Sequence, residues 1–96
     1  MLEIKIEKSF KKDIQRDKKS GFYSKNDFSL LKDIIESLQN KKAIDVKHKR
    51  HFLKGVMNGY ECLHIKNDWL LIFKVDNSFL TLVMIGKHTQ VYKKFK

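Results

Sequence analysis

The sequence predicts an α+β fold with an opening strand, two helices and a C-terminal three-stranded antiparallel sheet. Two observations lead to this prediction. Apolar residues recur with a helical period over residues 9–40, whereas residues 60–85 form short apolar runs separated by turn residues. The chain has 96 residues without proline or a linker-like tract, so we expect a single domain covering residues 1–96.

The first half is expected to begin with one strand and one helix. Residues 2–6 alternate apolar and charged side chains, which is typical of a half-buried strand. Phe10 and Ile14 predict a first helix from about Ser9 to Lys19, with Gly21 as its stop signal.

The second helix has the clearest apolar stripe in the chain. Ser24 or Asn26 can cap its N-terminus, and Asp27 in the first turn is favourable beside the positive end of the helix dipole. We expect this helix to end near Asn40. The stripe follows a 3.6-residue period and consists of Phe28, Leu31, Ile34, Ile35 and Leu38.

Residues 41–54 differ from both helices, because they are rich in lysine and arginine and show no period. We expect a basic loop here, with Gly55 and Gly59 allowing tight turns after it. Three strands are predicted beyond this loop: Tyr60–Lys66, Trp69–Val75 and Phe79–Ile85.

The turns between these strands bring three polar side chains to one end of the sheet. The strand through His64 runs up to the turn at Asp68, and the third strand returns to the same end before His88. Antiparallel neighbours joined by tight turns lie about 5 Å apart. We therefore expect His64, Asp68 and His88 to be neighbours. His51 cannot be placed by this topology, although the span to Gly59 is long enough for it to reach the same end.

Composition indicates a basic protein that folds without disulfides. The chain has 21 Lys+Arg against 11 Asp+Glu, a net charge of +10 and a pI near 9.8, which favours a polyanionic partner such as nucleic acid. A lysine-rich surface without function, or an acidic protein partner, would give the same charge. One cysteine, no apolar signal segment at the N-terminus and no run long enough to span a bilayer predict a cytoplasmic protein.

The predicted cluster suits RNA cleavage by transesterification. A base removes the proton of the ribose 2′-OH, this oxygen attacks the adjacent phosphate, and an acid protonates the leaving 5′-oxygen. Imidazole can serve in both roles because its unperturbed pKa of about 6.5 lies near neutral pH. Trp69 and Tyr92 are candidates for stacking on an unpaired base. The candidate RNA-binding cations are Lys47, Lys49, Arg50, Lys54 and Lys87.

Each of these residues also has a purely structural interpretation. An isolated histidine in a basic protein is usually a surface residue, Asp68 can be a turn residue, and Trp69 can belong to the core. No thiolate-stabilising motif accompanies Cys62, and no spacing typical of a zinc site is present, so we expect neither a metal nor another cofactor.

The second half resembles a known toxin family. Three segments show the resemblance: His51-Phe-Leu-Lys-Gly55, then Gly59-Tyr with Cys62-Leu-His64-Ile-Lys-Asn-Asp68-Trp69, and then Gly86-Lys-His88-Thr-Gln-Val-Tyr92. They are similar to the pattern of YafQ-type toxins, which belong to the RelE/ParE superfamily of bacterial type II toxin–antitoxin systems.

The resemblance implies a small twisted antiparallel sheet with two N-terminal helices packed on one face, a microbial-ribonuclease or RelE-like fold. It also implies an mRNA endoribonuclease that acts in the ribosomal A site. The partner would be a cognate antitoxin, with the free toxin a monomer and a higher-order complex formed with the antitoxin. The residues matching the family's acid–base positions are His51, His64, Asp68 and His88, while Trp69 matches its tryptophan. Tyr92, also a catalytic candidate, takes the place usually held by phenylalanine near the scissile nucleotide.

One position departs from the pattern. Met84 stands where the family commonly has arginine, so a phosphate-binding cation is missing, and Lys87 is the candidate to replace it as a point charge. Two other functions remain open, the first because of the shared fold and the second because of Met84. One is a ParE-like toxin that acts on DNA gyrase without nuclease activity, which the same fold would permit. The other is a degenerate module that binds the ribosome or RNA without cutting it.

Overall fold

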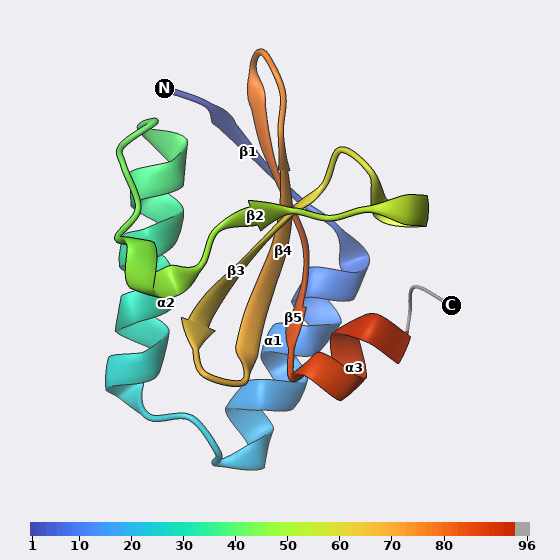
Figure 1. The fold of residues 1–96 in the computed structure, drawn as a ribbon. Helices are drawn as coiled ribbons and strands as arrows, with labels where there is room; N and C mark the ends of the chain where they lie inside the picture. Colours follow the sequence, from blue (N-terminus) through green and yellow to red (C-terminus); the bar gives the residue numbers. More distant parts are fainter. Residues whose placement is uncertain (94–96) are drawn as a thin grey trace.

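The computed structural model describes residues 1–93 and shows helices on both sides of a five-stranded sheet (Figure 1). The strands run in the order β1-β5-β4-β3-β2 across the sheet. In chain order the elements are β1 (Glu3–Ile6), α1 (Lys8–Ser20), α2 (Lys25–Gln39), the 3-10 helix η1 (Val46–His48), β2 (His51–Phe52), the 3-10 helix η2 (Gly55–Met57), β3 (Glu61–Lys66), β4 (Trp69–Val75), β5 (Phe79–Gly86) and α3 (His88–Lys93).

Local sequence signals explain where the two long helices begin and end. Gly21 closes α1 with a φ of 69°, a left-handed conformation that glycine adopts without steric cost. Ser24 and Asp27 form a capping box at the start of α2, in which each side chain accepts a hydrogen bond from the other residue's backbone N–H. Both helices were predicted with nearly these bounds.

The expected α+β fold is confirmed, and its sheet is mostly antiparallel. The predicted meander of β3, β4 and β5 is present, with every neighbouring pair antiparallel. The exception is β1, which pairs with β5 in parallel, with Glu3 opposite Phe79. A parallel pair requires a long crossover, which α1 and α2 provide at the start of the connection. The alternation of residues 2–6 indicates a strand but does not indicate its neighbour.

The basic segment 41–54 is more ordered than the expected loop. It contains η1, which Asp45 caps by accepting a hydrogen bond from the Lys47 backbone N–H, and the short edge strand β2. In β2, His51 lies opposite Cys62 of β3. Helix α3, which begins at His88, was not predicted, because six residues are too few to show a helical period.

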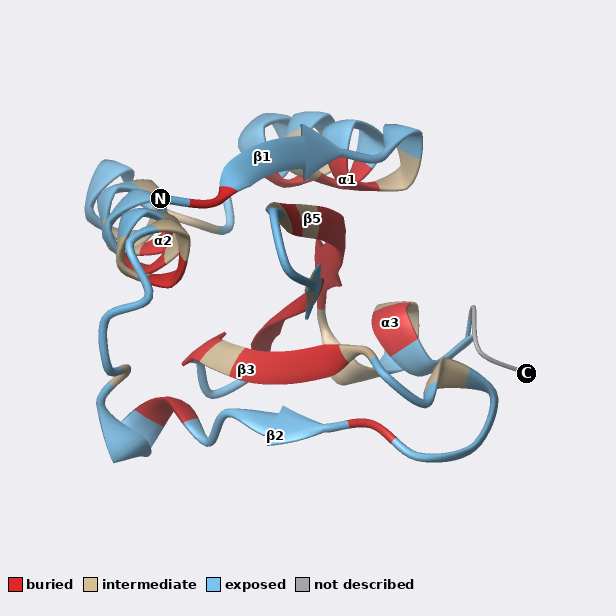
Figure 2. Ribbon diagram, turned by 90° about the horizontal axis from the view of Figure 1, so that it is seen from above, coloured by how far each residue is buried: buried red, intermediate tan, exposed pale blue. Residues whose placement is uncertain are grey.

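Two apolar clusters pack on opposite faces of the sheet. The larger cluster joins α1 and α2 to one face, and its buried residues include Phe10, Leu31, Ile34, Leu38, Leu63, Trp69, Leu71 and Phe73. The smaller cluster joins α3 to the other face, and its buried residues include Cys62, Leu70, Ile72, Val83, Met84 and Val91. Figure 2 shows α2 and α3 on opposite sides of the sheet. Within residues 1–93, no helix is long and apolar enough to cross a bilayer.

Candidate active site

Three histidines and a tyrosine form a row across one end of the sheet. The ring centroids of His51 and His64 are 6.5 Å apart, those of His64 and His88 are 5.3 Å apart, and those of His88 and Tyr92 are 5.9 Å apart. These residues come from β2, β3 and α3. The fold therefore gathers side chains that lie far apart in the sequence, between positions 51 and 92.

The strand register explains this convergence. His64 lies opposite Leu70 on β4, and Leu70 lies opposite Gly86 on β5. The ends of β3 and β5 and the start of β4 therefore lie at the same edge of the sheet. The chain then leaves Gly86 and enters α3 at His88, beside the turn that carries Asp68. The predicted proximity of His64, Asp68 and His88 is confirmed, while their catalytic role stays a prediction.

Asp68 holds His88 by two hydrogen bonds to one oxygen. Its Oδ1 lies 2.8 Å from the His88 backbone nitrogen and 2.6 Å from the His88 Nδ1. The backbone hydrogen bond, followed by that from the ring, lowers the pKa of Asp68 below its usual range. An ionised Asp68 only accepts hydrogen bonds, so Nδ1 of His88 carries a hydrogen and Nε2 is left for proton exchange.

His64 is half-buried between other basic groups. Desolvation lowers its pKa below 6.5, and the charges of His88, Lys49 and His51 act in the same direction. A hydrogen bond with the Asn67 backbone opposes this shift. His64 is therefore neutral at pH 7 and able to accept a proton.

His51 is exposed, and a backbone contact sets its tautomer. Its Nδ1 lies 2.7 Å from the carbonyl oxygen of Lys49. A carbonyl oxygen can only accept, so Nδ1 of His51 donates, and Nε2 of the neutral ring keeps its lone pair. Lys49 has a positive φ of 52°, at the end of η1, so this 3-10 helix directs the carbonyl toward His51.

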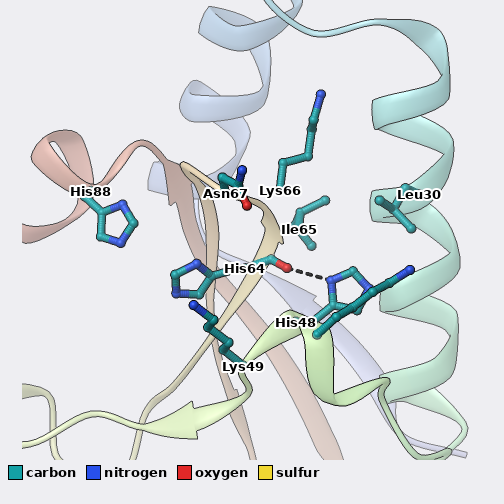
Figure 3. Close-up of a pocket in the computed structure, with 9 residues that line it drawn as sticks. Leu30, His48, Lys49, His64, Ile65, Lys66, Asn67 and His88 are labelled. Atoms are coloured by element: carbon teal, nitrogen blue, oxygen red, sulfur yellow. Dashed lines mark hydrogen bonds between the residues drawn. The ribbon is translucent and has the colours of Figure 1, made fainter.

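A fourth histidine, which was not predicted as part of the site, packs behind the row. His48 is buried, and its Nδ1 donates a hydrogen bond of 2.7 Å to the backbone oxygen of His64 (Figure 3). No sequence signal separates His48 from the other residues of the basic segment. Only the turn of η1, capped by Asp45, places its ring against β3.

A cleft of about 610 Å³ runs from the histidine row toward α2 (Figure 3). His64 and His88 lie at one end, and Leu30 of α2 lies at the other. Its lining includes three lysines: Lys47, Lys49 and Lys66. Lys66 is partly neutralised, because its Nζ lies 3.1 Å from an Asp27 carboxylate oxygen, Oδ1. The cleft is thus basic and open beside two imidazoles.

Arg50 and Lys54, two of the predicted RNA-binding cations, do not line this cleft. Arg50 turns to the buried carboxylate of Glu61, with Nε 2.7 Å from Oε1 and Nη2 3.2 Å from Oε2. Both oxygens of Glu61 thereby accept from Arg50, which ties the segment before β2 to β3. Lys54 is exposed at the start of η2.

Trp69 cannot stack on an RNA base, which corrects that candidate role. Its side chain is fully buried, its ring stacks on Tyr23 at 4.2 Å, and its Nε1 donates to Asp17 Oδ2 at 2.9 Å. Asp17 also accepts from Arg16, which donates to the carbonyl oxygen of Ile85 at 2.9 Å. This network on α1 ties the start of β4 to the end of β5, directly beside the histidine row.

Met84 and Cys62 both belong to the apolar cluster under α3. Met84 is buried there, so position 84 offers no cation to a phosphate. Lys87 points its Nζ at the ring of Phe22, 4.0 Å from the centroid. Burial raises the pKa of the Cys62 thiol to about 11, so Cys62 is protonated at neutral pH. Among the described residues, no group of three His, Cys, Asp or Glu side chains could hold a metal ion.

Tyr92 closes the row on α3, with Val91 buried beside it. The tyrosine is 39% exposed, and burial of its other part raises the pKa of its hydroxyl. The hydroxyl is therefore neutral at pH 7 and can donate a hydrogen bond.

Comparisons with known proteins identify the family. A family model described as "Bacterial toxin of type II toxin-antitoxin system, YafQ" matches residues 2–93. The chain is 32% identical over 90 residues to the mRNA interferase toxin YafQ of Escherichia coli (strain K12), a match that covers 82% of this chain and 98% of that protein.

Solved structures agree with this assignment. The crystal structure of YafQ from E. coli strain BL21(DE3) matches with a TM-score of 0.86 and 25% identity, covering 96% of this chain and 99% of that one. The E. coli DinJ–YafQ complex matches with a TM-score of 0.84 and 26% identity, again covering 96% and 99%. The chain belongs to the YafQ family of bacterial toxins of type II toxin–antitoxin systems.

Proposed function

We propose that this protein is a ribosome-dependent mRNA endoribonuclease that cleaves by attack of the ribose 2′-OH on the adjacent phosphate. The observation that carries the proposal is the pair of His64 and His88, whose rings are 5.3 Å apart and whose hydrogen-bond partners differ. The relative in E. coli is named an mRNA interferase toxin, which supports the same substrate class.

The two imidazoles suit opposite proton-transfer roles. His64 is neutral at pH 7 and takes the proton of the 2′-OH, while the O2′–P bond forms. His88 acts from its doubly protonated form: Nδ1–H stays hydrogen-bonded to Asp68, and the second proton, on Nε2, passes to the 5′-oxygen as the P–O5′ bond breaks. The products are a 2′,3′-cyclic phosphate and a 5′-hydroxyl end. At one end of the row, the Tyr92 hydroxyl donates a hydrogen bond that stabilises the phosphorane. At the other end, His51 does the same from Nε2 when its ring carries a proton on both nitrogens.

The surrounding surface suits an mRNA strand held in the ribosomal A site. Lys47 and Lys49 are exposed in the cleft that begins at the histidines, and they provide positive charge for RNA phosphates. The partner that silences the protein is a cognate antitoxin, by analogy with the DinJ–YafQ complex of E. coli. The net charge of +10 favours an antitoxin segment with acidic residues.

The test is cleavage of a defined mRNA on purified ribosomes with the A site empty. The wild type is expected to produce a fragment with a 5′-hydroxyl and a complementary fragment ending in a cyclic phosphate. His88→Gln and His64→Gln are each expected to lower the rate constant about 100-fold or more, the usual size of a general acid or base contribution.

The control is Asp33→Ala, on the exposed face of α2 and outside the cleft, which is expected to keep wild-type cleavage. Both glutamine variants must keep the urea midpoint of the wild type. Full cleavage by both variants would refute the assigned chemistry. Ribosome binding without any cleavage by the wild type would instead identify a non-cutting module.

A further inference from the structure

A second hollow adjoins the turn between β3 and β4. It has a volume of about 270 Å³ and shares Lys66 and Asn67 with the histidine cleft. Its remaining walls include Phe22, Asp68 and Lys87. Asp68 is the carboxylate that holds His88, so one wall of the hollow is hydrogen-bonded to a residue of the row.

Phe22 is an exposed aromatic residue held in a defined position. It lies in the short connection between α1 and α2, and 68% of it is exposed. Its backbone N–H donates to the Ser20 hydroxyl at 3.1 Å, and its ring is tilted against that of Tyr23 at a centroid distance of 5.7 Å. A phenylalanine with so much exposed surface contributes little to the core, although hydrogen bonds order the connection that carries it.

Two stacked aromatic rings and a lysine also line the hollow. Tyr23 stacks on the buried Trp69 at 4.2 Å with an interplanar angle of 16°. Lys87 Nζ lies 4.0 Å from the Phe22 ring centroid. The exposed Asn67 supplies an amide that can both donate and accept hydrogen bonds. An aromatic ring can stack on an unpaired base, an amide can hydrogen-bond to a base edge, and an ammonium group can neutralise a phosphate.

We propose that Phe22, with Lys87 and Asn67, forms a subsite for an unpaired RNA base next to the scissile phosphate. The base stacks on Phe22, and Lys87 neutralises the phosphate that joins this nucleotide to the one being cleaved. This subsite rests on the proposed nuclease function, since it is defined by its place beside His88. Lys87 directly precedes His88 in the chain, and Asp68 accepts a hydrogen bond from the His88 backbone N–H. It also gives Lys87 a role other than replacing the missing arginine at position 84.

The test is a thermodynamic cycle between the protein and the mRNA. Cleavage of ribosome-bound mRNA is measured for the wild type and Phe22→Leu, with intact mRNA and with an abasic nucleotide placed in turn at each position flanking the cleaved bond. Phe22→Leu is expected to lower kcat/KM by about 5- to 150-fold on intact mRNA, the range for the loss of one stacked base. At one flanking position, the abasic nucleotide is expected to cause the same loss in the wild type and no further loss in Phe22→Leu.

The chain offers a matched control and a rescue. Lys5 and Phe79 form a second lysine–phenylalanine contact, 3.8 Å from Nζ to the ring centroid, at the opposite end of β5. Phe79→Leu is expected to leave kcat/KM unchanged, and Phe22→Trp is expected to keep wild-type cleavage because the indole also stacks. Equal urea midpoints for Phe22→Leu and the wild type show that folding is intact.

Three results would overturn the subsite. One is wild-type cleavage by Phe22→Leu. Another is that, at every flanking position, the fold reduction in kcat/KM for the double change equals the product of the reductions caused by Phe22→Leu and by the abasic nucleotide. That result would show that Phe22 and the bases act independently. A wild-type protein that cuts no mRNA would remove the subsite together with the proposed function, whereas the first two results leave the nuclease function standing.

Discussion

The two central imidazoles differ in their partners, although their rings are only 5.3 Å apart. A carboxylate holds His88, while half-buried His64 is surrounded by the charges of His88, Lys49 and His51. Two neighbouring groups with different environments can divide acid and base roles between them. The pKa of His64 is therefore the property that most directly reports on the site.

We expect the pKa of His64 to lie below 6.5 in NMR titrations of the histidine rings. Replacing His88 by glutamine removes one neighbouring charge and should raise the pKa of His64, although it stays below 6.5 because desolvation is the larger cause. The unfolded chain takes up this proton more readily than the folded one. The contribution of His64 to stability is thus complete above pH 6.5 and declines as the pH falls below that value. A His64 titration above 6.5 would contradict this prediction.

His48 positions His64, and its substitution should separate catalysis from binding. His48→Leu removes the donor to the His64 carbonyl and should lower kcat about 10- to 100-fold, the size expected from slight misplacement of a reacting group, with KM unchanged. His48→Asn keeps a donor and should restore most of the rate. Equal loss in both variants would show that the hydrogen bond does not matter.

At the level of elements, α1 does more than cover the sheet. Its carboxylates hold both strands that end at the site: Asp17 accepts from the Trp69 indole, and Asp13 accepts from the Ile85 backbone N–H at 3.1 Å. Arg16 connects the two carboxylates, with its side chain 36% exposed. The network thus fixes the distance between the turn that carries Asp68 and the start of α3.

Asp17→Ala should destabilise the protein by about 2 kcal/mol or more, because a buried indole N–H loses its acceptor and Arg16 loses a partner. The free energy of unfolding in urea measures this change. Asp33→Ala, on the exposed face of α2, should change it by no more than about 0.5 kcal/mol. Equal effects of the two substitutions would show that the network contributes nothing specific.

For the whole molecule, a net charge of +10 predicts binding to ribosomes that weakens steeply with salt. The cleft concentrates part of this charge beside the histidines through Lys47 and Lys49. Replacing both by glutamine should reduce the slope of log Kd against log salt by roughly 1.4, about 0.7 for each phosphate contact to a single strand. Lys11→Gln with Lys12→Gln on α1, the same change in net charge, should leave the slope nearly unaltered. Equal slopes for both pairs would show that the charge acts only as a diffuse field.

Much of this architecture follows from local chemistry. Ser24 and Gly21 mark helix ends because capping and left-handed turns depend on a few adjacent residues. The meander from residue 60 to residue 86 follows from short apolar runs and turn residues, and with it the meeting of His64, Asp68 and His88. These features depend on neighbours in the sequence or on strands joined by tight turns.

The remaining features depend on contacts between distant segments, so they become visible only in the folded protein. They are the burial of Trp69 against Asp17, the pairing of β1 with β5, and the position of His48 behind His64. The position of a single His or Trp in a sequence does not indicate which distant residues will pack against its side chain. Residue type and local pattern thus limit which side chains can do the chemistry, whereas packing across the sheet selects those that face the cleft, because that selection depends on segments far apart in the chain.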